Sequence, residues 1–368
     1  MQHIPLDKEI VRFRDHLNIA PRVVFSAKFG DGKTTFLKKM KEHEVMKDYH
    51  FFTLHPINYS VSKNEDVFEY IKRDILLQLA KEGFLDNFDL GAAVNTIYNW
   101  QTLYEALTFI LQFIPNGGAI VKLIDKAKSL CDKYKQEENT WKVYEETFKS
   151  QRGGIYEEDG YTMLIRHGID IIHREDKKTC LIIEDLDRID PGHLFRILNV
   201  IGAHVDDENG YNKFGFTNIV AVMDYGITKH IFRHFYGEEA NYDGYMSKFT
   251  SHYVFNYSIN KMARHYFYNE MRRNTGLDTD KIKNIVINMI INSPVTIDSV
   301  VKDMSLRDIT KVLDGIEQQI DCSRVVINNG ELVTDAPILY LLAVIKRMPV
   351  DRNSYKINRN RSRNWVAW

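Results

Sequence analysis

Short apolar runs alternate with amphipathic stretches along the chain. The apolar runs predict buried strands at residues 22–26, 50–54, 179–183 and 218–223, and a further strand could lie within 249–257. Apolar residues at three- and four-residue spacing predict helices between them, at 5–18, 33–44, from about 66, at 161–173 and at 191–204. The run at 179–183 is apolar on both faces, which is typical of a parallel sheet covered by helices. The alternation predicts a doubly wound α/β core.

Two further regions have a helical pattern without strands. Residues 86–150 form a long insertion between strands, and the pattern beyond residue 259 is again helical, with helices beginning near 297 and 306. We therefore expect an α/β core over 1–258 with the insertion at about 86–150, a helical lid over 259–345, and a tail over 346–368. The tail is rich in Lys and Arg and ends with two Trp residues, so it could bind nucleic acid through phosphate contacts and stacking.

The charge balance, the cysteines and the apolar stretches of the chain argue against several classes of protein. The 368 residues carry 49 Lys and Arg against 50 Asp and Glu, which argues against a broadly basic surface for nucleic acid. The three cysteines lie far apart and show no metal-binding spacing, so a disulfide framework is excluded and a cytoplasmic location is expected. The apolar stretch at 106–121 is interrupted by a Pro-Asn-Gly-Gly turn, so no membrane span is predicted.

The segment 26–35, Ser-Ala-Lys-Phe-Gly-Asp-Gly-Lys-Thr-Thr, carries the most specific chemistry. It matches G-x-x-x-x-G-K-[ST] except that Ala27 takes the place of the first Gly, and it lies between a predicted strand and a predicted helix. Backbone amides of such a loop and of the helix N-terminus bind phosphates. Lys33 can neutralise β- and γ-phosphate charge, and the Thr34 hydroxyl can ligate Mg²⁺. The candidate nucleotide-binding residues here are Ala27, Phe29, Gly30, Asp31, Gly32, Lys33, Thr34 and Thr35.

The segment 184–188, Glu-Asp-Leu-Asp-Arg, directly follows the apolar strand 179–183. Carboxylates at the carboxyl end of a parallel strand face the ligand edge of the sheet. One of them can hold Mg²⁺ and the next can polarise an attacking water. Counting along the strand puts Glu184 at the metal position and Asp185 at the base position, but the reverse assignment stays open because successive strand residues point to opposite faces.

The sequence Glu-Asp-Leu-Asp-Arg resembles the D-D-L-D-R signature of the KAP family of P-loop NTPases, relatives of the STAND signalling ATPases. Residues 218–224 resemble the next strand of that family, with Asp224 at its first-sensor position. Residues 245–249 resemble the segment that follows, with Lys248, and residues 305–309 resemble a lid helix whose Arg307 can reach the nucleotide. The resemblance spans about residues 20 to 315 and departs from the family where Glu184 replaces Asp and where Ser precedes Lys248.

The resemblance implies a three-layer P-loop NTPase sandwich with a mostly parallel sheet, using ATP and Mg²⁺. It implies an ATPase that works as a conformational switch, in a homo-oligomer with a separate effector protein, and bacterial proteins of this type often act in anti-phage defence. Lys33, Glu184, Asp185 and Arg307 are then the catalytic candidates, Asp224 and Lys248 join the nucleotide site, and Thr34, Glu184 and Asp185 are the metal ligands. The alternatives are a nucleotide-gated scaffold with little hydrolysis and a nucleic-acid-stimulated ATPase.

Overall fold

The computed structural model describes residues 5–59, 67–86, 88, 100–113, 118–134, 159–202, 212–285, 296–314, 316 and 336–348. The chain forms two compact units. We call Lys8–Ser26 with Lys39–Asn256 the sheet unit, and Met1–Asp7 with Ala27–Lys38 and Tyr257–Trp368 the loop–lid unit. The domain boundaries predicted at residues 258 and 345 stay predictions.

The sheet unit is built on five parallel strands in the order β2-β3-β4-β1-β5. Their bounds are β1 Arg22–Ser26, β2 Tyr49–Leu54, β3 Lys178–Ile183, β4 Asn218–Met223 and β5 Phe255–Asn256. The four apolar runs are thus confirmed as strands, within one residue of their predicted ends. The strand expected at 249–257 is much shorter, with β5 at Phe255–Asn256, because Ser247–Phe249 forms a 3₁₀ turn (η4) that ends at the extended Thr250.

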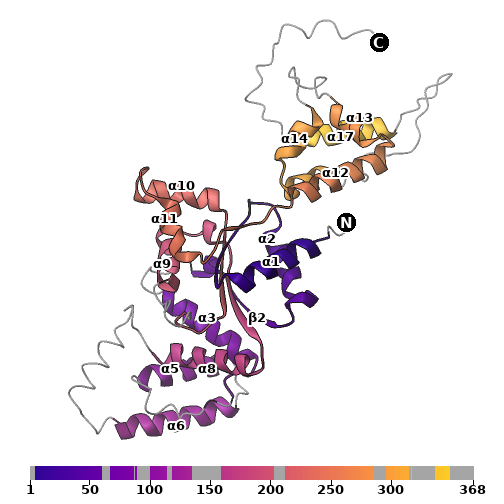
Figure 1. The fold of residues 1–368 in the computed structure, drawn as a ribbon. Coiled ribbons are helices and arrows are strands. Elements are labelled where there is room, and N and C mark those ends of the chain that lie inside the picture. Colours follow the sequence, from indigo (N-terminus) through magenta and orange to yellow (C-terminus); the bar gives the residue numbers. More distant parts are fainter. Residues whose placement is uncertain are drawn as a thin grey trace, which may run out of the picture. The chain divides into compact units, whose positions relative to one another are not determined.

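Helices cover both faces of this sheet, as the doubly apolar strand predicts. On one face, Val24, Phe52 and Leu181 join a core shared with three helices, α3 (Val67–Lys81), α8 (Gly160–Arg174) and α9 (Pro191–Gly202). On the other face, the Phe13 ring of α1 (Asp7–Ile19) makes an edge contact with Phe25, with ring centroids 5.4 Å apart. Figure 1 shows α1 and α3 on opposite sides of the strands. The mixed α/β architecture is that of a P-loop NTPase.

Two helices represent the predicted insertion, α5 (Trp100–Phe113) and α6 (Gly118–Tyr134). The remaining parts of 86–150 lie outside the described residues, apart from residues 86 and 88. One face of α5 is fully buried through residues spaced by three and four, namely Leu103, Ala106, Leu107 and Ile110. This apolar stripe packs α5 against α6, α8 and α3, so the insertion shares its core with the sheet unit.

The start of α8 is attached to α3 by a buried ion pair. The Lys72 ammonium, with no exposed surface, donates to the Asp159 carboxylate and lies 2.5 Å from Glu69 Oε1. Asp159 also caps α8 by accepting the Thr162 amide at 2.8 Å. Charged groups are rarely buried unless they are paired, so this cluster holds the two helices in one arrangement.

The loop–lid unit contains helices of the C-terminal region: α12 (Asn260–Thr275), α13 (Thr279–Asn284), α14 (Ile297–Asp303), α15 (Leu306–Leu313) and α17 (Ala336–Arg347). The two helices expected near 297 and 306 begin at those residues. Arg347 ends α17 and donates to the Asp314 carbonyl at 2.6 Å, so one basic residue of the predicted tail stabilises the end of α15. The tail beyond Met348 lies outside the described residues.

The apolar stretch at 106–121 was not expected to span a membrane. Across the residues that the structure describes, no helix combines the length and the apolar character needed to cross a bilayer.

Candidate functional site

The phosphate loop leaves β1 at Ser26 and enters α2 (Lys33–Lys41). Gly30 has a φ of +90° and Gly32 a φ of +77°, conformations that side chains disfavour. The Gly32 carbonyl accepts the Phe36 amide at 2.9 Å and so begins the helix. Lys33 is buried, and its Nζ donates to the Ala27 carbonyl at 3.3 Å. The lysine therefore lies folded across the loop, as a phosphate-binding lysine must.

Within the loop–lid unit, Arg307 contacts this loop. Its backbone amide donates to the Gly30 carbonyl at 3.2 Å, and its guanidinium lies 4.8 Å from the centroid of the Phe29 ring. A guanidinium over an aromatic face is a favourable cation–π contact. The contact is anchored by Ser305, which forms a capping box with Asp308 at the start of α15. The structure therefore brings Arg307 together with the predicted loop residues.

Gly30→Ala should destabilise this contact by about 1–3 kcal/mol. A methyl group at Gly30 would lie 2.7 Å from Ser305 Oγ, at a φ of +90°. Ser305 Oγ cannot move away cheaply, because it accepts the Asp308 amide at 3.2 Å and donates to Asp308 Oδ2 at 2.7 Å. Urea unfolding of the variant measures the loss.

Gly276→Ala is the matched control, since Gly276 has a φ of +69° but no atom within 4 Å of the added carbon. It reports the backbone strain alone, so the Gly30 variant should lose more free energy of unfolding. Equal losses would contradict a tight contact between the loop and Ser305.

The acidic strand end belongs to the sheet unit. Glu184 is buried, and its amide donates to the Leu54 carbonyl at 3.0 Å. Its carboxylate lies 3.9 Å from Lys41 Nζ, which donates to Thr53 Oγ1 at 2.6 Å. Burial raises the pKa of Glu184, while Lys41 opposes that rise. Burial likewise lowers the pKa of Lys41, against the pull of Glu184. The two groups thus form a part-buried pair at the ends of β2 and β3.

Asp185 has different surroundings. Its backbone is left-handed, with a φ of +53°, which is uncommon for a residue other than glycine. Its carboxylate lies 3.2 Å from the Arg188 guanidinium at a more exposed position than Glu184. Strained backbone of this kind is a feature of functional turns. Which of the two carboxylates meets the metal remains a prediction.

The end of β4 is tied to its neighbours by three polar groups. The Asp224 amide donates to Asp187 Oδ2 at 3.1 Å, and the Tyr225 amide donates to Ser26 Oγ at 3.1 Å. The Asp224 carboxylate caps α10 (Tyr225–Tyr236) by accepting the amides of Gly226 and Ile227. Asp224 therefore lies at the carboxyl edge of the sheet, as predicted, but its side chain caps α10.

Lys248 is not brought to that edge. Its carbonyl accepts a hydrogen bond from Arg22 Nη1 at 3.0 Å, which places Lys248 beside the first residue of β1. The phosphate loop follows the last residue of that strand, Ser26. The Lys248 side chain is exposed. The phosphate role of Lys248 stays a prediction.

Lys41 was missed by the sequence reasoning. It lies eight residues after Lys33, a spacing that belongs to no phosphate-binding motif, and it is one of several lysines on α2. Only the meeting of α2 with the ends of β2 and β3 reveals its proximity to Glu184.

The topology of the sheet indicates where a ligand belongs. The chain leaves β1 toward β2 at one edge of the sheet, whereas it leaves the adjacent β4 toward β5 at the other edge. Ligands of open α/β sheets bind beyond the carboxyl ends of strands at such a reversal. Ser26 and Tyr225 lie at that point, and the phosphate loop begins with the next residue of the chain.

The model of the KAP family P-loop domain matches residues 15–313. This chain belongs to the KAP family. The match starts within α1 and ends at the last residue of α15, so it includes the phosphate loop, the acidic strand end and Arg307. No curated protein matches this KAP-family chain.

Proposed function

We propose that this KAP-family protein binds Mg-ATP, hydrolyses it and acts as a conformational switch. The observation that carries the proposal is the phosphate loop, in which two glycines with positive φ precede α2 and the buried Lys33 is the first residue of that helix. Such a loop presents backbone amides and a partial positive charge to phosphate oxygens. Phosphate oxygens would be a stronger acceptor for the Lys33 ammonium than the Ala27 carbonyl at 3.3 Å.

The other loop residues have distinct proposed roles. Thr35 belongs to the first turn of α2, so its amide would face the phosphates. The Asp31 amide donates to the Lys28 carbonyl at 3.3 Å, so Asp31 would shape the loop around the phosphates. Ala27 supplies the carbonyl that holds Lys33, and its small side chain stands where the motif has glycine. Phe29 is half exposed and would flank the nucleotide together with Arg307.

The chain also carries donors that suit Mg²⁺. The Thr34 hydroxyl and the Glu184 and Asp185 carboxylates are hard oxygen donors, which this ion prefers. Bound Mg²⁺ would supply neutralisation of the charge on the β- and γ-phosphates. The carboxylate that does not face the metal would orient and polarise the attacking water. Lys41 and Arg188 would hold these two carboxylates in place.

The switch role rests on the contact between Arg307 and the loop. Its amide uses the Gly30 carbonyl and its guanidinium covers Phe29, so a nucleotide that rearranges this loop would change the position of α15. A ligand shifts such an equilibrium only through its different affinity for the two arrangements. We propose that ATP and its hydrolysis product differ in this way.

A scaffold that binds ATP but hardly hydrolyses it is the second candidate. This candidate is favoured because both acidic side chains already have a cation beside them: Glu184 lies near Lys41, and Asp185 lies near Arg188. A carboxylate engaged by a cation of the protein is less available to hold Mg²⁺ or to orient an attacking water.

Metal removal tests the proposal. Phosphate release from ATP should be measured with Mg²⁺ and after chelation, at multiple and at single turnover. Mg²⁺-dependent turnover is expected, and it should stop when the metal is chelated. Tight ATP binding without release of phosphate in a single turnover would favour the scaffold, and the absence of ATP binding would contradict both.

The biological setting is a further part of the proposal. We propose a homo-oligomer that acts with a separate effector protein, in anti-phage defence, as the KAP resemblance implies. Ile227, Phe235 and Tyr236 of α10 are each more than two-fifths exposed, which supports a surface used in association. Measurement of the assembly mass with and without Mg-ATP checks the oligomer.

A further inference from the structure

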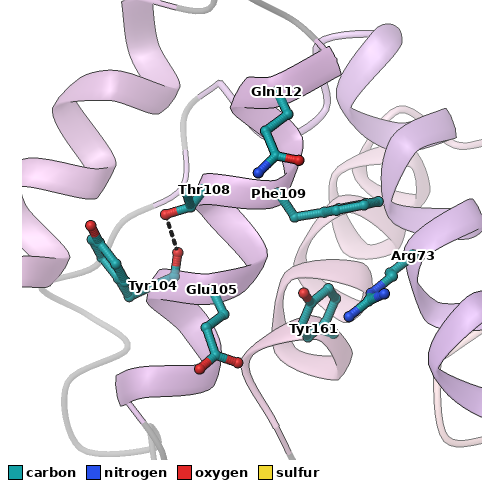
Figure 2. A pocket seen from close by; sticks show the side chains of 7 residues that line it. All are labelled: Arg73, Tyr104, Glu105, Thr108, Phe109, Gln112 and Tyr161. Carbon is teal, nitrogen blue, oxygen red and sulfur yellow. Dashed lines mark hydrogen bonds between the residues drawn. The ribbon is translucent and has the colours of Figure 1, made fainter. Parts of the chain in front are cut away.

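A pocket of about 470 Å³ lies among the helices of the sheet unit, next to the buried Lys72 pair (Figure 2). It is lined by residues of α3, α5 and α8: Arg73, Tyr104, Glu105, Thr108, Phe109, Gln112 and Tyr161. Its volume falls within the usual range of small-molecule sites.

The lining is separate from the face that packs the helix. Five of the residues lie on one face of α5, at positions 104, 105, 108, 109 and 112, whereas the buried stripe of this helix uses 103, 106, 107 and 110. Tyr161 also belongs to the hydrophobic core and Phe109 packs against it, so the charged and amide side chains are the part of the lining that core packing does not explain. Side chains of this kind, converging on one hollow, are typical of a binding site.

Arg73 is the most unusual member of the lining. Its guanidinium lies 5.4 Å from the centroid of the Phe109 ring and 5.9 Å from that of Tyr161, and its buried Nε has no hydrogen-bond partner among the described residues. Within the described part of the chain, no carboxylate forms an ion pair with it. A guanidinium positioned between aromatic rings with unused N–H groups is suited to bind a carboxylate through two hydrogen bonds.

Glu105 supplies the opposite charge. Figure 2 shows Tyr161 between the Arg73 and Glu105 side chains. Charges on both sides act on the Tyr161 hydroxyl: burial raises its pKa, Arg73 lowers it through charge and a hydrogen bond, and Glu69 and then Glu105 raise it. The pocket thus offers a cation and an anion on either side of an aromatic ring, with the Phe109 ring beside the cation.

We propose that this pocket binds a free aromatic α-amino acid. Arg73 binds its carboxylate, Glu105 binds its ammonium, and its ring packs against Phe109 and Tyr161. The pairing of one cation with one anion selects a zwitterion over a simple organic acid or amine, and the two rings select an aromatic side chain over an aliphatic one.

Three ligands test the two charges separately. Isothermal titration of the full chain compares L-tryptophan with its methyl ester, which lacks the carboxylate, and with indole-3-propionate, which lacks the ammonium. Each analogue should bind about tenfold or more weakly, because a charge-assisted hydrogen bond is lost and its partner is left unpaired. L-Leucine tests the aromatic requirement, and L-phenylalanine and L-tyrosine report which ring fits best.

Two variants assign the charges to residues. Arg73→Gln should weaken the binding of L-tryptophan but leave the affinity for its methyl ester unchanged. Glu105→Gln should weaken the binding of L-tryptophan but leave the affinity for indole-3-propionate unchanged. Arg174→Gln, at an exposed position at the far end of α8, is the matched control and should bind as the wild type does.

The ligand comparison uses the unaltered protein, so it does not depend on how the variants fold. No binding of any aromatic amino acid at millimolar concentration would overturn the proposal. Equal affinity for tryptophan and its ester, or wild-type binding by Arg73→Gln, would also overturn it.

Discussion

Lys33→Ala should reduce Mg²⁺-dependent ATP hydrolysis by about 100- to 1000-fold, the usual loss when one group that stabilises developing charge is removed. Lys33 is the buried ammonium of the phosphate loop, held at the Ala27 carbonyl. In the proposed site its charge would neutralise phosphate oxygens at a buried position, where an ionic contact is stronger than in water. Backbone amides of the loop remain in the variant, so nucleotide binding should weaken less than turnover.

Phosphate release at saturating ATP and an equilibrium measurement of ATP binding are the two readouts. Lys38→Ala is the matched control, because Lys38 is an exposed lysine of the same helix and should keep full activity. If Lys33→Ala hydrolyses ATP as fast as the wild type, the proposed site is wrong.

Asp159→Ala should lower the free energy of unfolding of the sheet unit by about 3 kcal/mol or more, as breaking a buried ion pair does. The change removes the cap of α8 and takes one of two neighbouring carboxylates from Lys72, which has no exposed surface, while Glu69 stays beside it. Loss of the cap alone accounts for about 1 kcal/mol.

The loss of stability caused by Asp159→Ala should depend on pH. Burial would raise the pKa of Asp159, but the charge of Lys72 and hydrogen bonds from Lys72 and Thr162 outweigh it and hold that pKa below the ordinary value of 3.8. A lowered folded-state pKa stabilises the protein above the unfolded value and loses that effect as the pH falls toward the folded value. The difference between wild type and variant should therefore shrink below about pH 3.8.

Urea unfolding near neutral pH measures the loss. Asp190→Ala is the control, because Asp190 accepts the Gly192 amide at 2.8 Å at the start of α9 but is exposed. It should cost about 1 kcal/mol, the usual value of a cap. Equal losses for the two variants would show that the Lys72 pair adds nothing.

Much of the fold could be predicted from local pattern. The strand at residues 22–26 and the helix after it follow from an apolar run, two glycines and a helical spacing, all within twenty residues. The phosphate loop is recognisable for the same reason, since the residues proposed to bind phosphate are neighbours in the chain. The short strand Phe255–Asn256 was overestimated, because an apolar run is also compatible with the 3₁₀ turn that buries Phe249.

The side-chain roles at the sheet edge were less predictable. Asp224 was correctly placed after β4, but its use as a helix cap depends on the direction in which α10 leaves the strand. Lys248 was assigned from the resemblance of residues 245–249 to a family segment, and its position beside Arg22 depends on where η4 meets β1. A motif describes which residues are near along the chain, and not which element they will meet.

By itself, the sequence determined the alternation of strands and helices, the loop that would bind phosphate and the carboxylates that end β3, because each depends on residues close together in the chain. The tertiary structure alone decided the strand order, the approach of Lys41 to Glu184 and the meeting of Arg73, Glu105 and Tyr161 in one pocket. These features join segments separated by tens to hundreds of residues. Their proximity depends on how the buried faces of whole helices and strands pack, which no local pattern contains.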